Sequence, residues 1–379
     1  GSFYYGRNDD IKKISIINNV EYINLWKDFP IYGYGSAINL DLNSNLIIKN
    51  VYSEGFYCIS SCPLFAVNDS SKLEILNINM KNIHSNELGI IIHVDSNSSN
   101  NNQATIKGSN CTFTNIEQES SRDSALIWNS GGLVDLIEAI FENFKANHSS
   151  ILYVYNSGYI YLQKTNFCNI YNKQTCNGIL MESNVFIRGL NKENNVYLRK
   201  INIENYNVCI NKSTECLKVQ KELNNDKNTV FVWINEIYDF NLETLYMNNF
   251  NLYTMFISDI KSSINIISSV ISNGYFQIGA INYSESNIPR KINIINSSFK
   301  YLYSYNSPVI QINYLSKLYN CNTLFKNVIF EEVVAQDRGG VIFSDSEYTN
   351  KIVTFDQCTF INTKAKYGKT LAIRNKYSI

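Results

Sequence analysis

The chain has 379 residues, and its 33 Lys and Arg residues balance its 33 Asp and Glu residues. Only 17% of the residues are charged, and a neutral chain this poor in Lys and Arg argues against nucleic-acid binding. The 57 Asn and 17 Gly residues disfavour helices, and the Ile residues, 27 Tyr and 20 Phe favour pleated strands. No apolar run approaches the ~18 residues of a membrane helix, so we expect no membrane span in this segment. Three His residues leave little room for a metal centre, and we expect neither metal nor cofactor.

Three kinds of short apolar segment recur in the same order along the chain. The first, a strand unit, alternates polar and apolar residues at 72–76, 263–267, 291–295 and 351–355. The second, a Phe unit, reads small-x-Phe-x-Asn at 111–115, 139–143, 165–169 and 358–362. The third, an apolar unit, is a small residue followed by an apolar run at 124–128, 150–154, 178–181 and 339–343.

This order predicts an all-β protein, a right-handed parallel β-helix with three short strands per coil. A period of about 25 to 30 residues gives roughly twelve coils, each strand pairing with its equivalent in the next coil. We expect residues 1–379 to form a single β-helix domain. Because neither end reads as a polar cap, we also expect the domain to be part of a longer repeat array.

The Phe unit predicts which side chains fill the narrow interior. Its small residue and its Phe lie two positions apart, so both face inward. Cys111 and Cys358 occupy the small position and are expected to be buried free thiols. The Asn that follows Phe falls at a turn, where its left-handed conformation is tolerated and its amide can bond to the next coil.

Residues 184–228 interrupt the pattern. They contain no clear coil, and we expect an irregular insertion there. Such an insertion on a solenoid is either a binding loop or a decorative one, and the sequence leaves both open.

Six of the nine cysteines form three local pairs. No His stands near them at zinc-ligand spacing, so disulfides are favoured over metal, with buried thiols as the remaining alternative. The predicted pairs are Cys58 with Cys62, Cys168 with Cys176, and Cys209 with Cys216. Disulfides indicate an extracellular location.

Asn-x-Ser/Thr sequences provide candidate glycosylation sites, although their number is what chance predicts in a chain this rich in Asn. The candidates are Asn68, Asn97, Asn110, Asn147, Asn211, Asn282 and Asn296.

A search for catalytic groups finds no recurring carboxylates. A lyase or glycosidase on this fold needs acidic side chains converging from adjacent coils. Asp337, the pair Glu331 and Glu332, and Asp123 each stand alone in the repeat. We therefore expect the chain not to be an enzyme.

A stripe of outward apolar side chains is the predicted binding surface. We expect the polar residue that closes an apolar unit to point outward, and alternation then assigns its neighbours. In the unit at 150–154, Leu152 and Val154 are expected to point inward, which places Tyr153 and Tyr155 outside. The predicted binding residues are Tyr153, Tyr155, Leu180, Phe231, Trp233 and Phe256, with Tyr159 and Tyr161 around the corner. Trp128 falls on the opposite parity and is predicted to lie in the core. Exposed aromatic residues indicate a protein or glycan surface, unless the insertion covers them.

The Cys/Ser-x-Phe-x-Asn units and Gly-Gly-Val-Ile strands resemble the repeats of the scaffoldins of anaerobic gut fungi, and more weakly those of chlamydial polymorphic outer-membrane proteins. The scaffoldin resemblance implies a secreted, non-catalytic cellulosome scaffold that binds dockerin domains of plant-cell-wall-degrading enzymes, and possibly polysaccharide. It assigns no residue as a dockerin contact, because the matching residues are core and turn positions. A β-helical adhesin or carbohydrate-binding protein is the alternative function, and a polysaccharide lyase or hydrolase is the second alternative.

Overall fold

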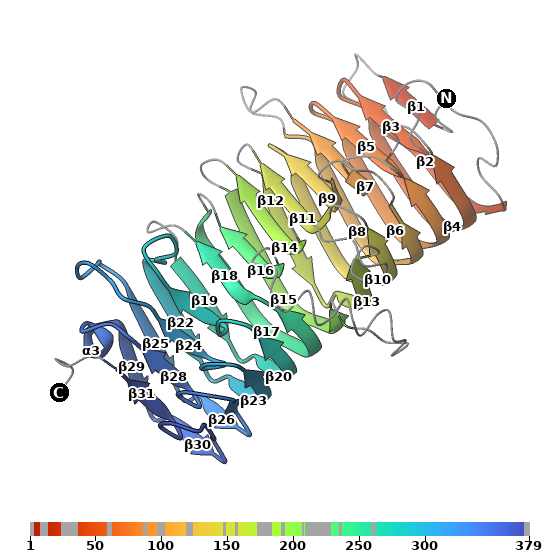
Figure 1. Ribbon diagram of the computed structural model, residues 1–379. Helices are drawn as coiled ribbons and strands as arrows, with labels where there is room; N and C mark the ends of the chain where they lie inside the picture. The colour runs from red at the N-terminus through yellow and green to blue at the C-terminus, as the bar shows by residue number, and fades with distance from the viewer. Residues whose placement is uncertain are drawn as a thin grey trace.

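The protein is a β-solenoid in which parallel strands stack along one axis, with the two ends of the chain at opposite ends of the stack (Figure 1). The structure is a computed structural model. It describes residues 4–7, 14–23, 37–58, 63–85, 89–96, 103–118, 124–146, 149–155, 158–172, 184–190, 194–206, 208, 229–234, 237–258 and 263–374. Strands make up 70% of it, and among the described residues one short helix, α3 (Thr349–Ile352), breaks the pattern. The predicted all-β class and parallel solenoid are confirmed.

Sheet A forms one side of the solenoid. Its nine strands, as far as the chain is described, are β1 (Tyr4–Arg7), β3 (Ile38–Asp41), β5 (Phe65–Asn68), β7 (Gly89–Asp95), β9 (Ser124–Ser130), β11 (Ser149–Tyr155), β14 (Asn184–Leu190), β16 (Thr229–Ile234) and β18 (Thr254–Ser258). The solenoid has about nine turns, and the predicted number of roughly twelve coils is not confirmed.

Sheet C follows with four strands in the described residues: β21 (Ile281–Tyr283), β24 (Ile310–Ile312), β28 (Ile342–Ser344) and β31 (Leu371–Ile373). The Met255 amide of β18 donates to the carbonyl of Ala280, just before β21, at 3.0 Å. This bond links the last strand of sheet A to the first strand of sheet C.

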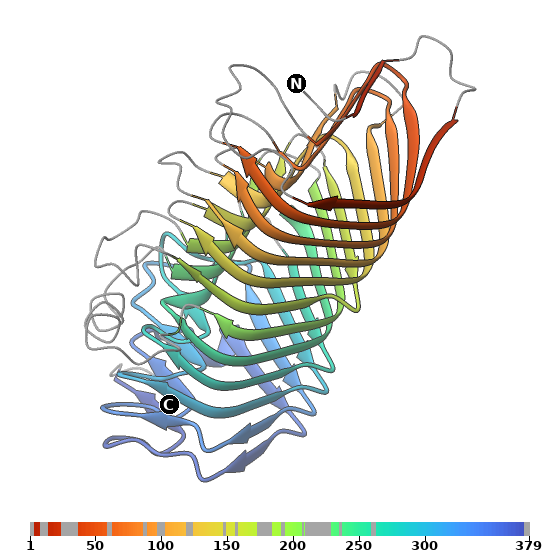
Figure 2. The same cartoon turned by 90° about the vertical axis from the view of Figure 1, so that its right-hand side faces the viewer.

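Sheet B runs the whole length of the described solenoid and wraps around it in long curved strands (Figure 2). Its strands in the first part are β2 (Ile14–Ile23), β4 (Asn45–Cys58), β6 (Lys72–Ser85), β8 (Thr105–Glu117), β10 (Leu133–Ala146), β12 (Tyr159–Gln163), β13 (Asn166–Asn172), β15 (Asn194–Tyr206) and β17 (Ile237–Leu252). They continue as β19 (Ser263–Ile267), β20 (Val270–Phe276), β22 (Lys291–Ile295), β23 (Ser298–Ser304), β25 (Asn322–Lys326), β26 (Ile329–Glu331), β27 (Val334–Ala335), β29 (Val353–Asp356) and β30 (Thr359–Ile361).

The long strands bend at residues with a left-handed backbone. Asn77 and Asn82 within β6 have φ angles of 55° and 54°, and Asn110 and Asn115 repeat this in β8. Asn is among the non-glycine residues that adopt this conformation most readily. The two strands predicted before each apolar unit are therefore one long strand bent at two points in this part of the chain.

The predicted role of the Asn after Phe is confirmed by a ladder of amide hydrogen bonds. Each Asn after the first donates from Nδ2 to Oδ1 of its equivalent in the preceding coil, at distances between 2.6 and 3.1 Å. The ladder contains Asn82, Asn115, Asn143, Asn169, Asn205 and Asn249. It accounts for part of the Asn excess.

The Phe units at 111–115, 139–143 and 165–169 fill the interior as predicted. Phe113, Phe141 and Phe167 are fully buried and stack with ring centroids 5.3 and 5.2 Å apart. Cys111 and Ala139 are neighbours in the small row beside them, and both are 1% exposed. Large and small rows side by side allow the interior to close without voids.

The prediction of an irregular insertion at 184–228 is wrong for the first half of this segment. Residues 184–206 supply β14 and β15, which pair in parallel with strands on both sides. The pattern was obscured because Ile203 takes the place of Phe, in register with Phe167 and Met247. Apart from residue 208, positions 207–228 lie outside the described residues.

Candidate binding groove

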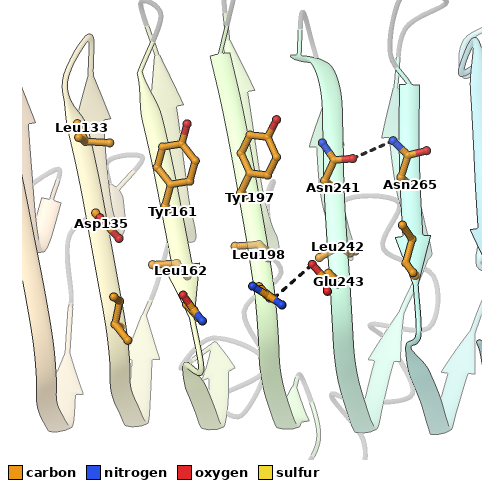
Figure 3. A pocket seen from close by; sticks show the side chains of 14 residues that line it. Leu133, Asp135, Tyr161, Leu162, Tyr197, Leu198, Asn241, Leu242, Glu243 and Asn265 are labelled. Atoms are coloured by element: carbon orange, nitrogen blue, oxygen red, sulfur yellow. Dashed lines mark hydrogen bonds and ion pairs between the residues drawn. The ribbon is translucent and has the colours of Figure 1, made fainter.

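A groove of about 580 Å³ crosses five neighbouring strands on the outer face of sheet B. The strands are β10, β12, β15, β17 and β19, so the groove runs along the axis of the solenoid and across the strands (Figure 3). Each strand contributes side chains at equivalent positions, because the parallel register is kept from one coil to the next. The central row consists of Asp135, Tyr161, Tyr197, Asn241 and Asn265.

Strict alternation along each strand directs this row outward. On β12, Ile160 and Leu162 are buried in the core, and Tyr161 between them faces the groove. Because successive side chains of a strand point to opposite faces, the apolar core fixes the position of the tyrosine. The groove is therefore built on the regular alternation of the sheet B strands.

Tyr161 and Tyr197 form an aromatic pair at the centre of the groove. Their ring centroids are 5.3 Å apart and their planes differ by 9°. In Figure 3 the two rings lie side by side with their hydroxyl groups pointing the same way. Burial, together with the neighbours Tyr197, Tyr159 and Asp135, raises the pKa of Tyr161.

Polar groups continue the groove on one side of the aromatic pair. Nδ2 of Asn265 donates to Oδ1 of Asn241 at 2.8 Å. Nε of Arg199 lies 3.3 Å from Oε2 of Glu243, and both side chains are about half exposed. This ion pair neutralises the one cationic side chain that lines the described groove. Asp135 then leaves the lining with a slight excess of negative charge.

The predicted stripe on sheet A is wrong at three positions. Phe231 and Phe256 are 0% and 1% exposed, and Tyr153 is 7% exposed. Phe256 is in register with Val232 and packs edge-on against Phe240, with ring centroids 6.3 Å apart. These side chains therefore do not form an exposed binding stripe.

Tyr153 does alternate with the buried residues Leu152 and Val154, as predicted, but it is covered on its own face. The rule that a closing polar residue points outward fails at Asn129. Asn129, the polar residue near the end of β9, is fully buried rather than outward. Its Nδ2 donates to the carbonyls of Gly132 and Tyr159, both at 2.9 Å, and so satisfies the backbone of the turn. Trp128 consequently lies on the opposite face from its predicted one, half-buried and stacked on Tyr153 with centroids 3.9 Å apart.

The remaining predicted binding residues have separate outcomes. Tyr159 and Tyr161 are partly exposed on β12, and Tyr161 lines the groove. Leu180 lies outside the described residues, and so do the side chains of Tyr155 and Trp233.

Tyr197 is the residue of the groove centre that the sequence pattern did not predict. It lies within residues 184–206, which were not recognised as a coil, although Tyr197 and Leu198 repeat the alternation of Tyr161 and Leu162. Aligning these two segments would have placed the tyrosines side by side.

One predicted disulfide is contradicted. Cys168 is a free thiol within β13, held in register between Glu142 and Glu204 of the neighbouring strands. Burial and these two carboxylates raise the pKa of the thiol. Of the other candidates, Cys62, Cys176, Cys209, Cys216 and the side chain of Cys58 lie outside the described residues.

The prediction of buried free thiols in the small row is confirmed for Cys111 and holds in part for Cys358. Cys111 is a buried free thiol, and burial raises its pKa to about 12. Cys358 is also free but only partly buried.

The glycosylation candidates divide by burial. Asn296 is exposed and Asn68 is partly exposed, so both remain possible acceptors. Asn282 is only 7% exposed and accepts a hydrogen bond from Nδ2 of Asn313 at 3.4 Å, so a glycan does not fit there in the folded chain. The candidates Asn97, Asn147 and Asn211 lie outside the described residues.

The isolated carboxylates found in the sequence take part in ion pairs. Asp337 Oδ2 lies 3.1 Å from Nε of Arg338, and Glu331 Oε2 lies 2.9 Å from Nζ of Lys300. Asp123 lies outside the described residues. Within the described part of the chain, no group of three or more His, Cys, Asp or Glu side chains could hold a metal ion.

No protein-family model matches the chain, and no curated protein matches it. A search of the described residues for a helix that could cross a membrane finds none.

Proposed function

We propose that the chain is a non-catalytic, extracellular scaffold segment that binds dockerin-bearing plant-cell-wall-degrading enzymes in a fungal cellulosome. The observation that carries this proposal is the register-locked parallel stack, in which each coil presents its outward side chains at equivalent positions. A repeat protein of this kind offers an extended surface to partners. The resemblance of its Phe units to scaffoldin repeats supplies the identity of the partner.

Co-elution tests this proposal. The purified chain is mixed with a dockerin-bearing cellulase and run on a size-exclusion column, with the same cellulase lacking its dockerin as the control. We expect a complex only when the dockerin is present. Separate elution in both mixtures would overturn the proposal.

A second candidate function, a β-helical adhesin or carbohydrate-binding protein, is favoured by the groove around Tyr161 and Tyr197. Concave sites with aromatic walls and a few oriented polar groups are typical of small-molecule and sugar binding. This function is compatible with a scaffold, because the groove occupies only part of the surface.

A polysaccharide lyase or hydrolase is the third candidate, and the groove argues against a glycosidase mechanism at this site. The carboxylates that line it, Asp135 and Glu243, lie three strands apart on β10 and β17. Three strands at about 4.8 Å each, with an offset of two residues along the strand, place their backbones about 16 Å apart, whereas the carboxyl groups of glycosidase pairs lie about 5 to 9.5 Å apart.

We also propose that sheet C continues sheet A. The hydrogen bond between Met255 and Ala280 supports this continuity, which would bring the number of coils close to the roughly twelve predicted. A right-handed path is proposed with it, since crossovers between parallel strands are almost always right-handed.

A further inference from the structure

We propose that the groove on sheet B binds a linear, uncharged polysaccharide that lies along the solenoid axis over Tyr161 and Tyr197. This inference rests on the second candidate function, carbohydrate binding, and names its site and ligand class. It is independent of enzyme docking, so either activity can fail without the other.

The direction of the groove indicates a polymer. It crosses five strands, and each coil adds one side chain to the central row. Adjacent strands lie about 4.8 Å apart, so polar and aromatic contacts recur at regular short intervals along the axis. A chain of linked monosaccharides presents its rings and hydroxyl groups with similar regularity. A compact ligand would use only part of such a row.

The lining of the groove matches the chemistry of sugar rings. A pyranose has faces of C–H groups and a rim of hydroxyl groups. Tyr161 and Tyr197 offer aromatic surface at the centre, and Ile137 and Ile267 offer apolar surface that is 37% and 36% exposed. The amides of Asn241 and Asn265 and the tyrosine hydroxyls can then exchange hydrogen bonds with the rim.

Charge in the groove favours an uncharged ligand. Arg199 is engaged by Glu243 at 3.3 Å, and Asp135 adds a negative charge near the aromatic pair. A uronic-acid polymer or a phosphorylated ligand requires free cationic side chains, and Arg199 alone among the described lining residues is cationic.

Size argues against a protein as the occupant. The volume of about 580 Å³ lies in the range of about 300 to 1,000 Å³ that is usual for ligand sites. A stable protein interface buries about 800 Å² on each partner, which a shallow groove of this size does not supply alone.

The test is affinity electrophoresis of the whole chain in gels that contain one polysaccharide each. The neutral probes are hydroxyethylcellulose, xyloglucan, arabinoxylan and galactomannan, and the acidic probe is polygalacturonate. Wild type is compared with Tyr161→Ala, Tyr197→Ala and Tyr197→Phe. Tyr246→Ala is the matched control, because Tyr246 is 41% exposed outside the groove and Tyr197 is 43% exposed within it. Circular dichroism checks that each variant is folded.

We expect at least one neutral polysaccharide to retard the wild type. Tyr161→Ala and Tyr197→Ala should each weaken binding about tenfold or more, as truncation of a central aromatic contact does. Tyr246→Ala should change it less than twofold, and Tyr197→Phe should retain most of it.

Three results would overturn the inference: no retardation by any neutral probe, binding to polygalacturonate alone, or equal losses in Tyr197→Ala and Tyr246→Ala. A fourth is that the groove variants lose dockerin co-elution while glycan binding is unchanged, which would make the groove a protein interface. Loss of glycan binding with dockerin co-elution intact would support the inference.

Discussion

The coils around Phe141 and the last described coil, around Phe360, are built from the same Phe unit but are supported differently. Phe141 is fully buried between Phe113 and Phe167 and lies beside the Asn ladder. Phe360 stacks on Phe330 on one side and is 39% exposed. The ladder is also incomplete towards the C-terminal end, where Tyr301 takes a ladder position with a φ of 53°. The comparison teaches that backbone turns and inward side chains define the coil, and that stacking and the amide ladder add stability to it.

The largest difference in stability between the two coils is expected when their core Phe residues are replaced. Phe141→Ala should destabilise the protein by about 3–5 kcal/mol, because it removes a fully buried ring and leaves a cavity between two others. Phe360→Ala should cost about 1–2 kcal/mol, since part of that ring is already in water. Urea unfolding of both variants measures the difference, and equal losses would contradict the comparison.

A smaller effect is expected in the Asn ladder. Asn143→Ala removes the bond that Nδ2 donates to Asn115 and the bond that Oδ1 accepts from Asn169, and it places Ala at a φ of 56°. We expect a loss of about 2 kcal/mol in unfolding free energy. Asn143→Gly adopts the left-handed backbone without strain, so it should lose only the share of the unfolding free energy that the two hydrogen bonds contribute. A Gly variant as unstable as the Ala variant would show that left-handed strain contributes nothing.

The two small-row cysteines should differ in their dependence on pH. Burial raises the pKa of Cys111 from 9.0 to about 12, so between these values the unfolded chain loses a proton that the folded chain keeps. Stability contributed by the neutral thiol is therefore complete below about pH 9 and falls by about 1.4 kcal/mol per pH unit above it. Unfolding of wild type and Cys111→Ala at pH 8, 9 and 10 isolates this loss. Cys358→Ala should change the pH dependence of the unfolding free energy less than Cys111→Ala does. A larger change in Cys358→Ala would contradict the assignment of Cys111 as the more buried thiol.

The smallest predicted effect is an increase in stability, on replacing Tyr301. Tyr301 is 43% exposed and adopts a left-handed conformation that is costly for a bulky side chain. Tyr301→Asn should raise the unfolding free energy by up to about 1 kcal/mol, because Asn accepts this backbone more readily. A thermal melt at neutral pH is sufficient, and a lower melting temperature would mean that the tyrosine makes contacts that outweigh its backbone strain.

The interior and the turns could be predicted because local rules decide them. Alternation places Phe141 and Ala139 on one face, and the tolerance of Asn143 for a left-handed backbone sets the bend that follows. Each of these positions depends on residues a few places away in the chain.

The faces of sheet A and the partner of Tyr161 could not be predicted in the same way. Polar residues were assumed to point outward, but Asn129 points inward to satisfy turn carbonyls. Tyr197 meets Tyr161 only through the register of β12 and β15, a long-range pairing that was obscured by the Ile203 substitution for Phe. Of the two tyrosines at the centre of the groove, the sequence therefore predicted only Tyr161.

The most direct test of the binding account is a crystal structure of the whole chain grown with a neutral oligosaccharide, chosen from the polysaccharide that retards it most. The account predicts sugar density along the solenoid axis, with rings over Tyr161 and Tyr197 and hydroxyl groups near Asn241 and Asn265. Well-ordered density at another surface, with the groove empty at saturating ligand, would contradict it.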